Sequence, residues 1–179
     1  MISQTFIDVC SRLRDIVSKT RDGKLPRDYW KAQPHVIFIL RDDHGNVMCV
    51  KQIRSDKLGP PKGAVDLDEK YGTIEGYLVD TKEFDFIPFA CAKRELREEL
   101  GASPSLVDSM NLQFRKELHK GNLYVNGEKF PRIIVILEGK FHQWMSQHIY
   151  PDMHEVSGYM MIDPKSLGQF KTNWATRYL

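Results

Sequence analysis

The first apolar positions of the chain recur every three to four residues, which is the spacing of one face of an α-helix. Charged residues interrupt the run, so it has neither the length of a membrane span nor the apolar stretch of a signal peptide. We therefore expect an amphipathic helix that covers the core, followed by a polar connector. The apolar positions are Phe6, Val9, Cys10, Leu13, Ile16 and Val17.

The next apolar stretches predict β-strands. HVIFILR (35–41) and NVMCVKQIR (46–54) are joined by the turn-forming DDHGN, which is the pattern of a β-hairpin. After Asp163 and Pro164, apolar residues predict a final helix with Leu167, Phe170, Trp174 and Tyr178 on one face. Further strands are expected at residues 112–118, 122–125, 132–141 and 158–162, with a short helix at 143–149.

Between these regions lie a long loop and a well-delimited helix. Residues 59–86 show no sustained period, so we expect a long loop with a short strand around residues 77–79. Pro88 and Gly101 suit the two ends of a helix that ends at Leu100. Strands and helices mix without regular βαβ alternation. This order favours a mixed sheet between helices in one α/β domain.

Composition limits the classes of partner. A net charge of +2 is too small to indicate nucleic-acid binding from bulk charge alone. Cys10, Cys49 and Cys91 are odd in number, widely spaced and embedded in apolar patterns. Neither disulfides nor a zinc site are therefore expected, and a reducing, cytoplasmic setting without a membrane partner is the prediction.

The charged stretch AKRELREELGA (92–102) is either a solvated helix face or a metal site. A face that pairs its own charges places opposite charges four residues apart, worth about 0.2 to 0.5 kcal/mol per pair. Here Glu95 precedes Glu99 and Lys93 precedes Arg97 by four, so like charges are gathered. Carboxylates in this register repel one another until a cation lies among them, and hard divalent cations prefer carboxylate oxygens. The register therefore favours a metal site.

RELREELGA (94–102) resembles the core of the Nudix box, Arg-Glu-apolar-x-Glu-Glu-x-Gly-apolar, of the Nudix hydrolase superfamily. The upstream half of the box, a glycine and a glutamate, is similar to Gly63 and Glu69. Residues 70 to 93, 24 in all, separate Glu69 from Arg94 where the box has seven, so the chain carries 17 extra residues. This excess predicts an inserted loop at about residues 70–86.

The resemblance implies the Nudix α/β/α sandwich with a mixed sheet. It covers residues 35–179, and residues 1–34 are expected as an extra N-terminal helix and connector packed on that domain. Aromatic and acidic residues of the inserted loop, among them Phe84, fit either a substrate-selecting flap or a tolerated surface insertion. Glu69 is displaced by the insertion, so its usual helix-anchoring role is open.

The resemblance also implies a reaction, the hydrolysis of a nucleoside diphosphate linked to another group with the help of Mg²⁺ or Mn²⁺. By position, Glu95, Glu98 and Glu99 correspond to metal ligands. The Gly63 carbonyl corresponds to a further ligand. Arg94 corresponds to the residue that orients the glutamates through a salt bridge.

The general base and the substrate contacts are less sharply defined by the resemblance. Glu155, in the loop before the last expected strand, corresponds to a glutamate that serves many members as base or added ligand, with Glu98 or Glu95 as the competing choices. Lys62, beside Gly63, is expected to reach substrate phosphate. Weaker candidates, each of which also fits a solvated or packing role, are Lys51, Arg54, Tyr124, Phe130 and Arg132.

PPKG (60–63) resembles most the Nudix branches that act on phosphate-rich substrates. We therefore expect a pyrophosphohydrolase of dinucleoside polyphosphates or of RNA 5′ ends and caps, with diphosphoinositol polyphosphates as a further class. The alternative is a non-catalytic Nudix-fold module that binds nucleotide or RNA, for which the displaced Glu69 is the only argument. The oligomeric state is not predicted.

Overall fold

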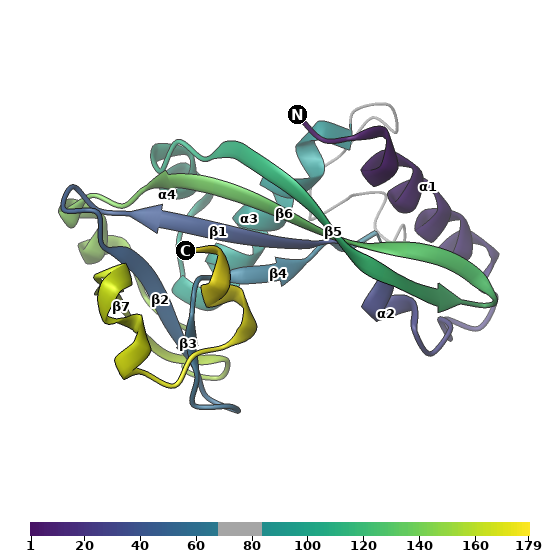
Figure 1. Cartoon of the computed structure of the whole chain (residues 1–179). Helices are drawn as coiled ribbons and strands as arrows, with labels where there is room; N and C mark the ends of the chain where they lie inside the picture. The colour runs from purple at the N-terminus through teal and green to yellow at the C-terminus, as the bar shows by residue number, and fades with distance from the viewer. Residues whose placement is uncertain (68–83) are drawn as a thin grey trace.

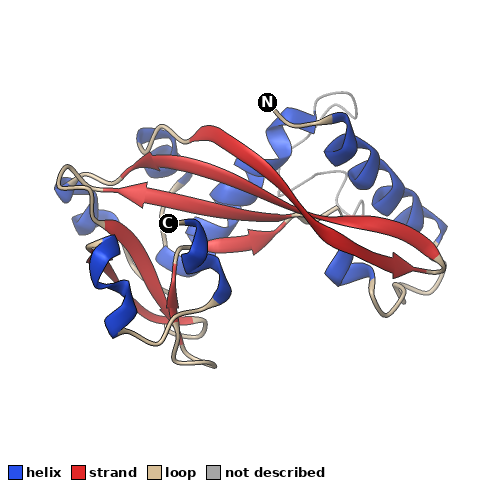
Figure 2. Cartoon of the chain, in the orientation of Figure 1, coloured by secondary structure: helices blue, strands red, loops and turns tan. Residues whose placement is uncertain are grey.

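A computed structural model of the chain describes residues 1–67 and 84–179 and shows a mixed sheet with helices on both faces (Figures 1 and 2). The α-helices are α1 (Gln4–Lys19), α2 (Tyr29–Ala32), α3 (Ile87–Leu100) and α4 (Pro104–Ser109), and the 3-10 helices are η2 (Phe84–Phe86), η3 (Gln143–His148), η4 (Pro164–Gln169) and η5 (Trp174–Tyr178). The strands are β1 (His35–Arg41), β2 (Val47–Gln52), β3 (Leu58–Gly59), β4 (Lys62–Ala64), β5 (Gln113–Val125), β6 (Glu128–Lys140) and β7 (Val156–Ile162).

The sheet has two parts that meet at the turn between β1 and β2. In one part β1 pairs antiparallel with β4 and parallel with β6, which pairs antiparallel with β5. In the other part β2 pairs antiparallel with β3 and β7. β1 and β2 are antiparallel as expected, but their register in the described residues consists of the pair Arg41 and Val47 beside the turn. The two strands then diverge, because β4 takes the remaining edge of β1 and β3 that of β2.

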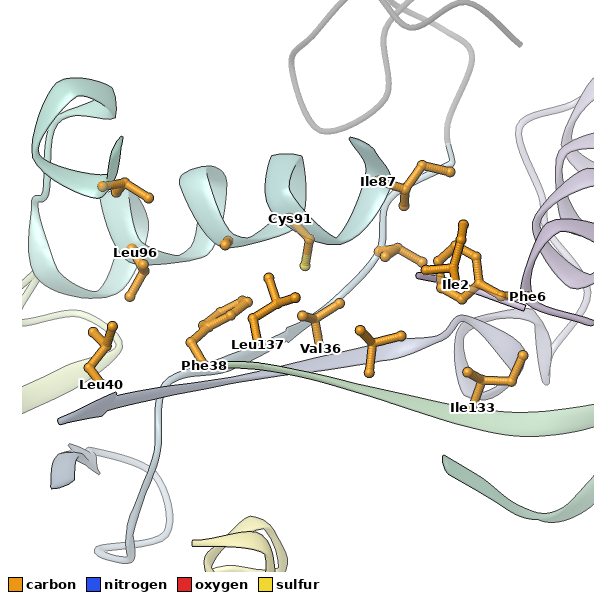
Figure 3. Packing of buried hydrophobic residues seen from close by; sticks show 14 of the residues in the cluster. Ile2, Phe6, Val36, Phe38, Leu40, Ile87, Cys91, Leu96, Ile133 and Leu137 are labelled. Carbon is orange, nitrogen blue, oxygen red and sulfur yellow. The ribbon is translucent and has the colours of Figure 1, made fainter. Parts of the chain in front are cut away.

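The main core lies between α3 and the sheet (Figure 3). Val36, Phe38 and Leu40 alternate along β1 and point towards the helix, as one face of a strand does. Cys91 and Leu96 of α3 meet them from above. The N-terminal residues belong to this same core, since α1 and the segment around α2 contribute Ile2, Phe6, Val9, Cys10, Leu13, Tyr29 and Ala32.

A smaller apolar cluster covers the opposite face of the sheet, where Ile37 and Ile39 of β1 pack against the C-terminal segment. The single helix expected after Pro164 is wrong: the segment forms two 3-10 helices, η4 and η5. Between them the backbone pairs with β3, because the Leu58 N–H donates to the Lys171 carbonyl and the Asn173 N–H donates to the Leu58 carbonyl. A chain held in this way cannot continue as a helix.

Several further elements differ from the expectation. The long loop expected at residues 59–86 begins with strand residues, those of β3 and β4, because they pair with β2 and β1. β5 is one strand with two register shifts, where two strands were predicted. The polar connector contains α2, with Tyr29 and Ala32 buried. Helix α4, whose N-terminus is capped by the Ser103 hydroxyl, was not predicted. The expected helix at 143–149 is the 3-10 helix η3.

The end of the predicted insertion packs against the body of the protein. Phe84 is buried in the main core, and the Arg14 guanidinium lies 5.3 Å from its ring centroid. Phe84 is therefore a core residue and is not free to form a flap over a substrate. The expected short strand at 77–79 and Glu69 lie outside the described residues. None of the helices in residues 1–67 and 84–179 combines the length and the hydropathy that a membrane span requires.

Candidate functional site

Helix α3 carries the glutamates of the predicted metal site on its C-terminal half. The helix begins with Pro88 in its first turn and ends at Gly101, which has a left-handed backbone conformation with φ of 64°. The Gly101 N–H donates to the Arg97 carbonyl, and the Ala102 N–H to the Leu96 carbonyl. These closing bonds hold the last turn, and with it Glu98 and Glu99, in a defined position.

Arg94 links this helix to strand β4. Its Nη2 lies 2.7 Å from Glu95 Oε1 and donates to the Ala64 carbonyl at 2.8 Å. Its Nη1 donates to Glu98 Oε2 at 3.0 Å. One planar guanidinium thus holds two carboxylates and one backbone oxygen, an arrangement that a point charge such as lysine cannot reproduce.

Gly63 lies on β4 directly against the Glu95 side chain. It pairs with Val36 of β1, so the position of its backbone is fixed by the sheet. A Cβ atom at this position would overlap the carboxyl group of Glu95. Glycine is therefore required by the close approach of β4 to α3, and its backbone stands next to a carboxylate of the predicted site.

Glu99 is a buried carboxylate. It is 6% exposed, and its Oε2 atom has no hydrogen-bond partner among the described residues. Burial raises the pKa of Glu99 to about 8, with Glu95, Glu155 and Glu98 adding to the rise and Lys62 opposing it. A carboxylate without a partner is costly to bury in its charged form, so this residue prefers its neutral form until a cation is present.

Glu155 approaches the helix from the loop before β7. This loop is tied to the end of α3, because the Asp152 N–H donates to the Glu99 carbonyl and the Tyr150 N–H to the Leu100 carbonyl. The Ile53 N–H donates to the Glu155 carbonyl, which ties the loop to the end of β2 as well. Together with this residue, three glutamates of α3 form what we call the carboxylate cluster, namely Glu95, Glu98, Glu99 and Glu155.

The residues of the carboxylate cluster fit a hard divalent cation in their chemistry. Glu99 supplies an oxygen without a hydrogen-bond partner among the described residues, and the charges of Glu95, Glu98 and Glu155 act on it. Oxygen donors of this kind suit Mg²⁺ and Mn²⁺. In residues 1–67 and 84–179, no three acidic, histidine or cysteine side chains are already drawn together as a coordination set. Arg94 engages one oxygen each of Glu95 and Glu98.

The predicted substrate-binding residues Lys62, Lys51 and Arg54 have different surroundings in the structure. Lys62 lies on β4 next to Gly63 and its charge acts on Glu99, so it belongs with the carboxylate cluster. Lys51 forms an ion pair with Asp56 at 2.9 Å. Arg54 lies in the turn after β2 and not on the strand as expected.

The three candidates of the β5–β6 hairpin have different surroundings. Tyr124 pairs in register with Lys129, on the part of the hairpin that extends past β1. Phe130 is fully buried with the Arg12 guanidinium 4.0 Å from its ring centroid, so it is a core residue and cannot border a pocket. Arg132 is exposed and lines a cleft beside Trp174.

Two features of the site were missed by the sequence analysis. The first is the Ala64 carbonyl, which anchors Arg94 and which no side-chain pattern can reveal. The second is Trp174, whose ring centroid lies 5.8 Å from Lys62 Nζ. Its helical spacing with Leu167 and Phe170 assigned Trp174 to packing, although it is 39% exposed.

Comparisons with known proteins identify the fold. No established protein-family profile matches the chain, and no curated protein matches it in sequence. Solved structures do match. The Nudix domain of NrtR from Shewanella oneidensis, in complex with ADP-ribose, superposes with a TM-score of 0.54 at 13% identity over 92% of this chain and 91% of that one.

Two further structures agree. RenU, a Nudix hydrolase from M. smegmatis, matches with a TM-score of 0.51 at 13% identity over 83% of this chain and 81% of that one. The dihydroneopterin triphosphate pyrophosphohydrolase of E. coli matches with a TM-score of 0.51 at 13% identity over 80% of this chain and 89% of that one. The chain therefore has the fold of the Nudix hydrolases, which confirms the fold expected from residues 94–102.

Proposed function

We propose that the chain is a Mg²⁺- or Mn²⁺-dependent Nudix pyrophosphohydrolase that cleaves the diphosphate linkage of a nucleoside diphosphate joined to another group. The observation that carries this proposal is the buried Glu99, 6% exposed, whose pKa is raised by burial and, in addition, by three neighbouring carboxylates. A solvated helix face gives no reason to bury a carboxylate with an unpaired oxygen, because this costs several kcal/mol. The cost is offset when a divalent cation is bound.

The residues that would hold the cation are Glu95, Glu98 and Glu99, with the Gly63 carbonyl and Glu155 as further ligands. When bound, the cation supplies neutralisation of the diphosphate charge and activation of water as the nucleophile. Arg94 acts as a positioning residue, since it fixes the carboxylates of Glu95 and Glu98 against β4.

Two glutamates compete for the role of general base. The Glu98 carboxylate already accepts a hydrogen bond from Arg94 Nη1 at 3.0 Å. Glu155 is exposed and has no ion pair with any residue in the described part of the chain. We assign Glu155 as the group that takes the proton from the attacking water. The Lys62 ammonium, on the same edge of the site, neutralises substrate phosphate.

For the substrate we favour dinucleoside polyphosphates or RNA 5′ ends and caps, with diphosphoinositol polyphosphates as a further class. Positively charged side chains near the site support this choice. Lys62 adjoins the carboxylate cluster, and further exposed cations lie along the β5–β6 hairpin. Phosphate-rich substrates need such compensation beyond the scissile diphosphate.

A hydrolysis panel tests the proposal. The protein is incubated with Mg²⁺ or Mn²⁺ and with diadenosine tetraphosphate, ADP-ribose, nucleoside triphosphates, capped RNA and diphosphoinositol phosphates. We expect hydrolysis of at least one phosphate-rich substrate, loss of it with EDTA, and loss of it in Glu98→Gln and Glu99→Gln. The matched control is Glu128→Gln, an exposed glutamate at the far end of the β5–β6 hairpin, which should leave the rate unchanged.

The same panel separates the enzyme from a non-catalytic Nudix-fold module that binds nucleotide or RNA. Such a module would be stabilised by metal and by nucleotide, would lose the metal effect in Glu99→Gln, and would hydrolyse none of the substrates. Turnover by the parent protein excludes the module.

A further inference from the structure

A second site lies on the face of the sheet opposite α3, and its lining residues come from the N-terminal end of β1, the β5–β6 hairpin and η5. It is a cleft of about 270 Å³. Its lining includes four cationic side chains and no carboxylate. We call it the basic cleft, and define it by Lys31, Lys120, Arg132, Arg177, Trp174 and Tyr178.

Three of the four cations of the basic cleft have no ion pair in the described residues. They are Lys120, Arg132 and Arg177, whereas Lys31 pairs with Asp28 at 3.5 Å. Burial and the nearby charges of Lys62 and Arg132 lower the pKa of His35, which lines the same cleft. A concave surface with one sign of charge concentrates ions of the opposite sign. The cleft therefore suits an anion.

The cleft also offers an aromatic surface. Trp174 is 39% exposed and meets His35 and Tyr178 at nearly perpendicular ring planes, 86° and 82°. Neither neighbour is stacked in parallel on the indole. A planar ring can therefore stack there, and stacking of a nucleobase on such a side chain contributes about 1 to 3 kcal/mol. A nucleotide combines the two features that the cleft suits, a negative charge and a planar ring.

The position of Trp174 is fixed by the fold. Asn173, the residue before it, donates its N–H to the Leu58 carbonyl at 2.9 Å, and its side chain occupies the space where a Cβ of Gly59 would lie. Ala175, the residue after it, is fully buried. The aromatic wall of the basic cleft thus exists before a ligand binds, which lowers the entropic cost of binding.

Lys62 connects the basic cleft with the carboxylate cluster. Its ammonium lies 5.8 Å from the Trp174 ring centroid, and its charge also lowers the pKa of Glu99. One extended ligand can therefore place a diphosphate at the carboxylate cluster and its far end beside Trp174. Three cations without an ion pair in the described residues exceed what an uncharged nucleoside needs, so we expect the far end to carry phosphate of its own.

Resting on the pyrophosphohydrolase function proposed above, we infer that the basic cleft binds a nucleotide unit of the substrate, with its base on Trp174 and its phosphate among Lys120, Arg132 and Arg177. The volume accommodates about one nucleotide, at the low end of small-molecule sites. The substrate class is thereby narrowed to pyrophosphates with a phosphorylated nucleoside at the end remote from the scissile bond, as in a dinucleoside polyphosphate. A diphosphoinositol has no base for Trp174.

The test is equilibrium binding without turnover. AMP, adenosine and inorganic phosphate are titrated into the wild-type chain in EDTA, by calorimetry. We expect AMP to bind at least tenfold more tightly than either adenosine or phosphate. Trp174→Leu and Arg132→Gln should each weaken AMP binding at least fivefold, while Trp174→Phe, which keeps a stacking ring, should stay within threefold of the wild type.

Matched controls are Trp144→Leu, an exposed tryptophan on η3, and Lys140→Gln, an exposed cation at the other end of β6. Both should bind AMP as the wild type does. Equal binding of AMP by Arg132→Gln, Trp174→Leu and the two controls would overturn the inference, as would equal affinity for adenosine and AMP. The binding test involves neither metal nor hydrolysis. If AMP binds as expected but no substrate of the panel is hydrolysed, the proposed function is wrong and the nucleotide site in the basic cleft stands. If a substrate is hydrolysed but AMP does not bind as expected, only the inference about the basic cleft is wrong.

Discussion

The carboxylate cluster and the basic cleft both gather like charges, but they do so in opposite surroundings. Glu99 is 6% exposed, and burial together with its acidic neighbours raises its pKa to about 8. Lys120, Arg132 and Arg177 stand in solvent, where water and salt screen their repulsion. The free-energy cost of holding like charges close together is therefore large in the carboxylate cluster and small in the basic cleft.

This difference determines what each region does in the free protein. The carboxylate cluster cannot keep all its charges without a cation, so its composition is a constraint on the fold as well as on the chemistry. The basic cleft can remain fully charged and ready for an anion. Removal of a charge from the carboxylate cluster should consequently stabilise the free protein. Removal of a charge from the basic cleft should have almost no effect on its stability.

The largest effect is expected from Glu99→Gln on hydrolysis. Loss of a charged oxygen donor from the proposed metal site should lower kcat/KM roughly 1,000-fold, about 4 kcal/mol of transition-state stabilisation. The variant should also lose the rise in Tm that Mg²⁺ or Mn²⁺ gives the parent. Steady-state kinetics and thermal unfolding with and without metal measure both quantities. An unchanged rate would remove the carboxylate cluster from the mechanism, and Glu128→Gln is the control.

The pH dependence of stability is the next largest effect, measured in EDTA. The pKa of Glu99 is about 8 in the folded protein and 4.5 in its ordinary state, so between these values the folded state binds more protons. Its contribution to the free energy of unfolding therefore falls as pH rises, by about 1 kcal/mol per unit and about 3 kcal/mol from pH 5 to 8. Glu99→Gln removes this pH-dependent contribution, so the free energy of unfolding of the variant should rise relative to that of the wild type as pH rises. Parallel urea-unfolding profiles of the two proteins would contradict the burial of this charge.

Three of the four glutamates of the carboxylate cluster could be predicted to lie together because they are local in the sequence. Glu95, Glu98 and Glu99 lie within one turn, and a helix converts their spacing into proximity without any knowledge of the rest of the fold. The helix ends at Pro88 and Gly101 were equally local signals. What spacing cannot show is that β4 passes so close to α3 that only glycine fits at position 63.

The basic cleft could not be predicted because four separate segments build it. Lys31, Lys120, Arg132 and Trp174 are brought together by the pairing of β1 with β6 and by the attachment of η5 to β3. The apolar spacing after Pro164 fits a helix, but hydrogen bonds to Leu58 interrupt it, and these depend on tertiary contacts. Phe84 could not be placed for the same reason. The sequence of a loop does not show whether an aromatic side chain in it packs into the core or points into solvent.

Arg94→Lys separates charge from geometry at the carboxylate cluster. Lysine keeps the positive charge but cannot engage Glu95, Glu98 and the Ala64 carbonyl together, so the carboxylates lose their shared orientation. We expect kcat to fall about 10- to 100-fold with little change in Tm. Arg115→Lys, at an arginine paired with Glu138 on the sheet edge, is the control and should stay within twofold. Equal effects in the two variants would show that charge alone matters.

The smallest effect is expected from Arg132→Gln on the stability of the free protein. The side chain is exposed and has no ion-pair partner in the described residues, so its loss removes only screened repulsion from Lys120 and Arg177. Urea unfolding at pH 8 should change by less than about 0.5 kcal/mol, against the gain of about 3 kcal/mol in Glu99→Gln. A gain above about 1 kcal/mol in Arg132→Gln would break the contrast, because it would mean that the basic cleft, like the carboxylate cluster, holds charge under strain in the absence of its ligand.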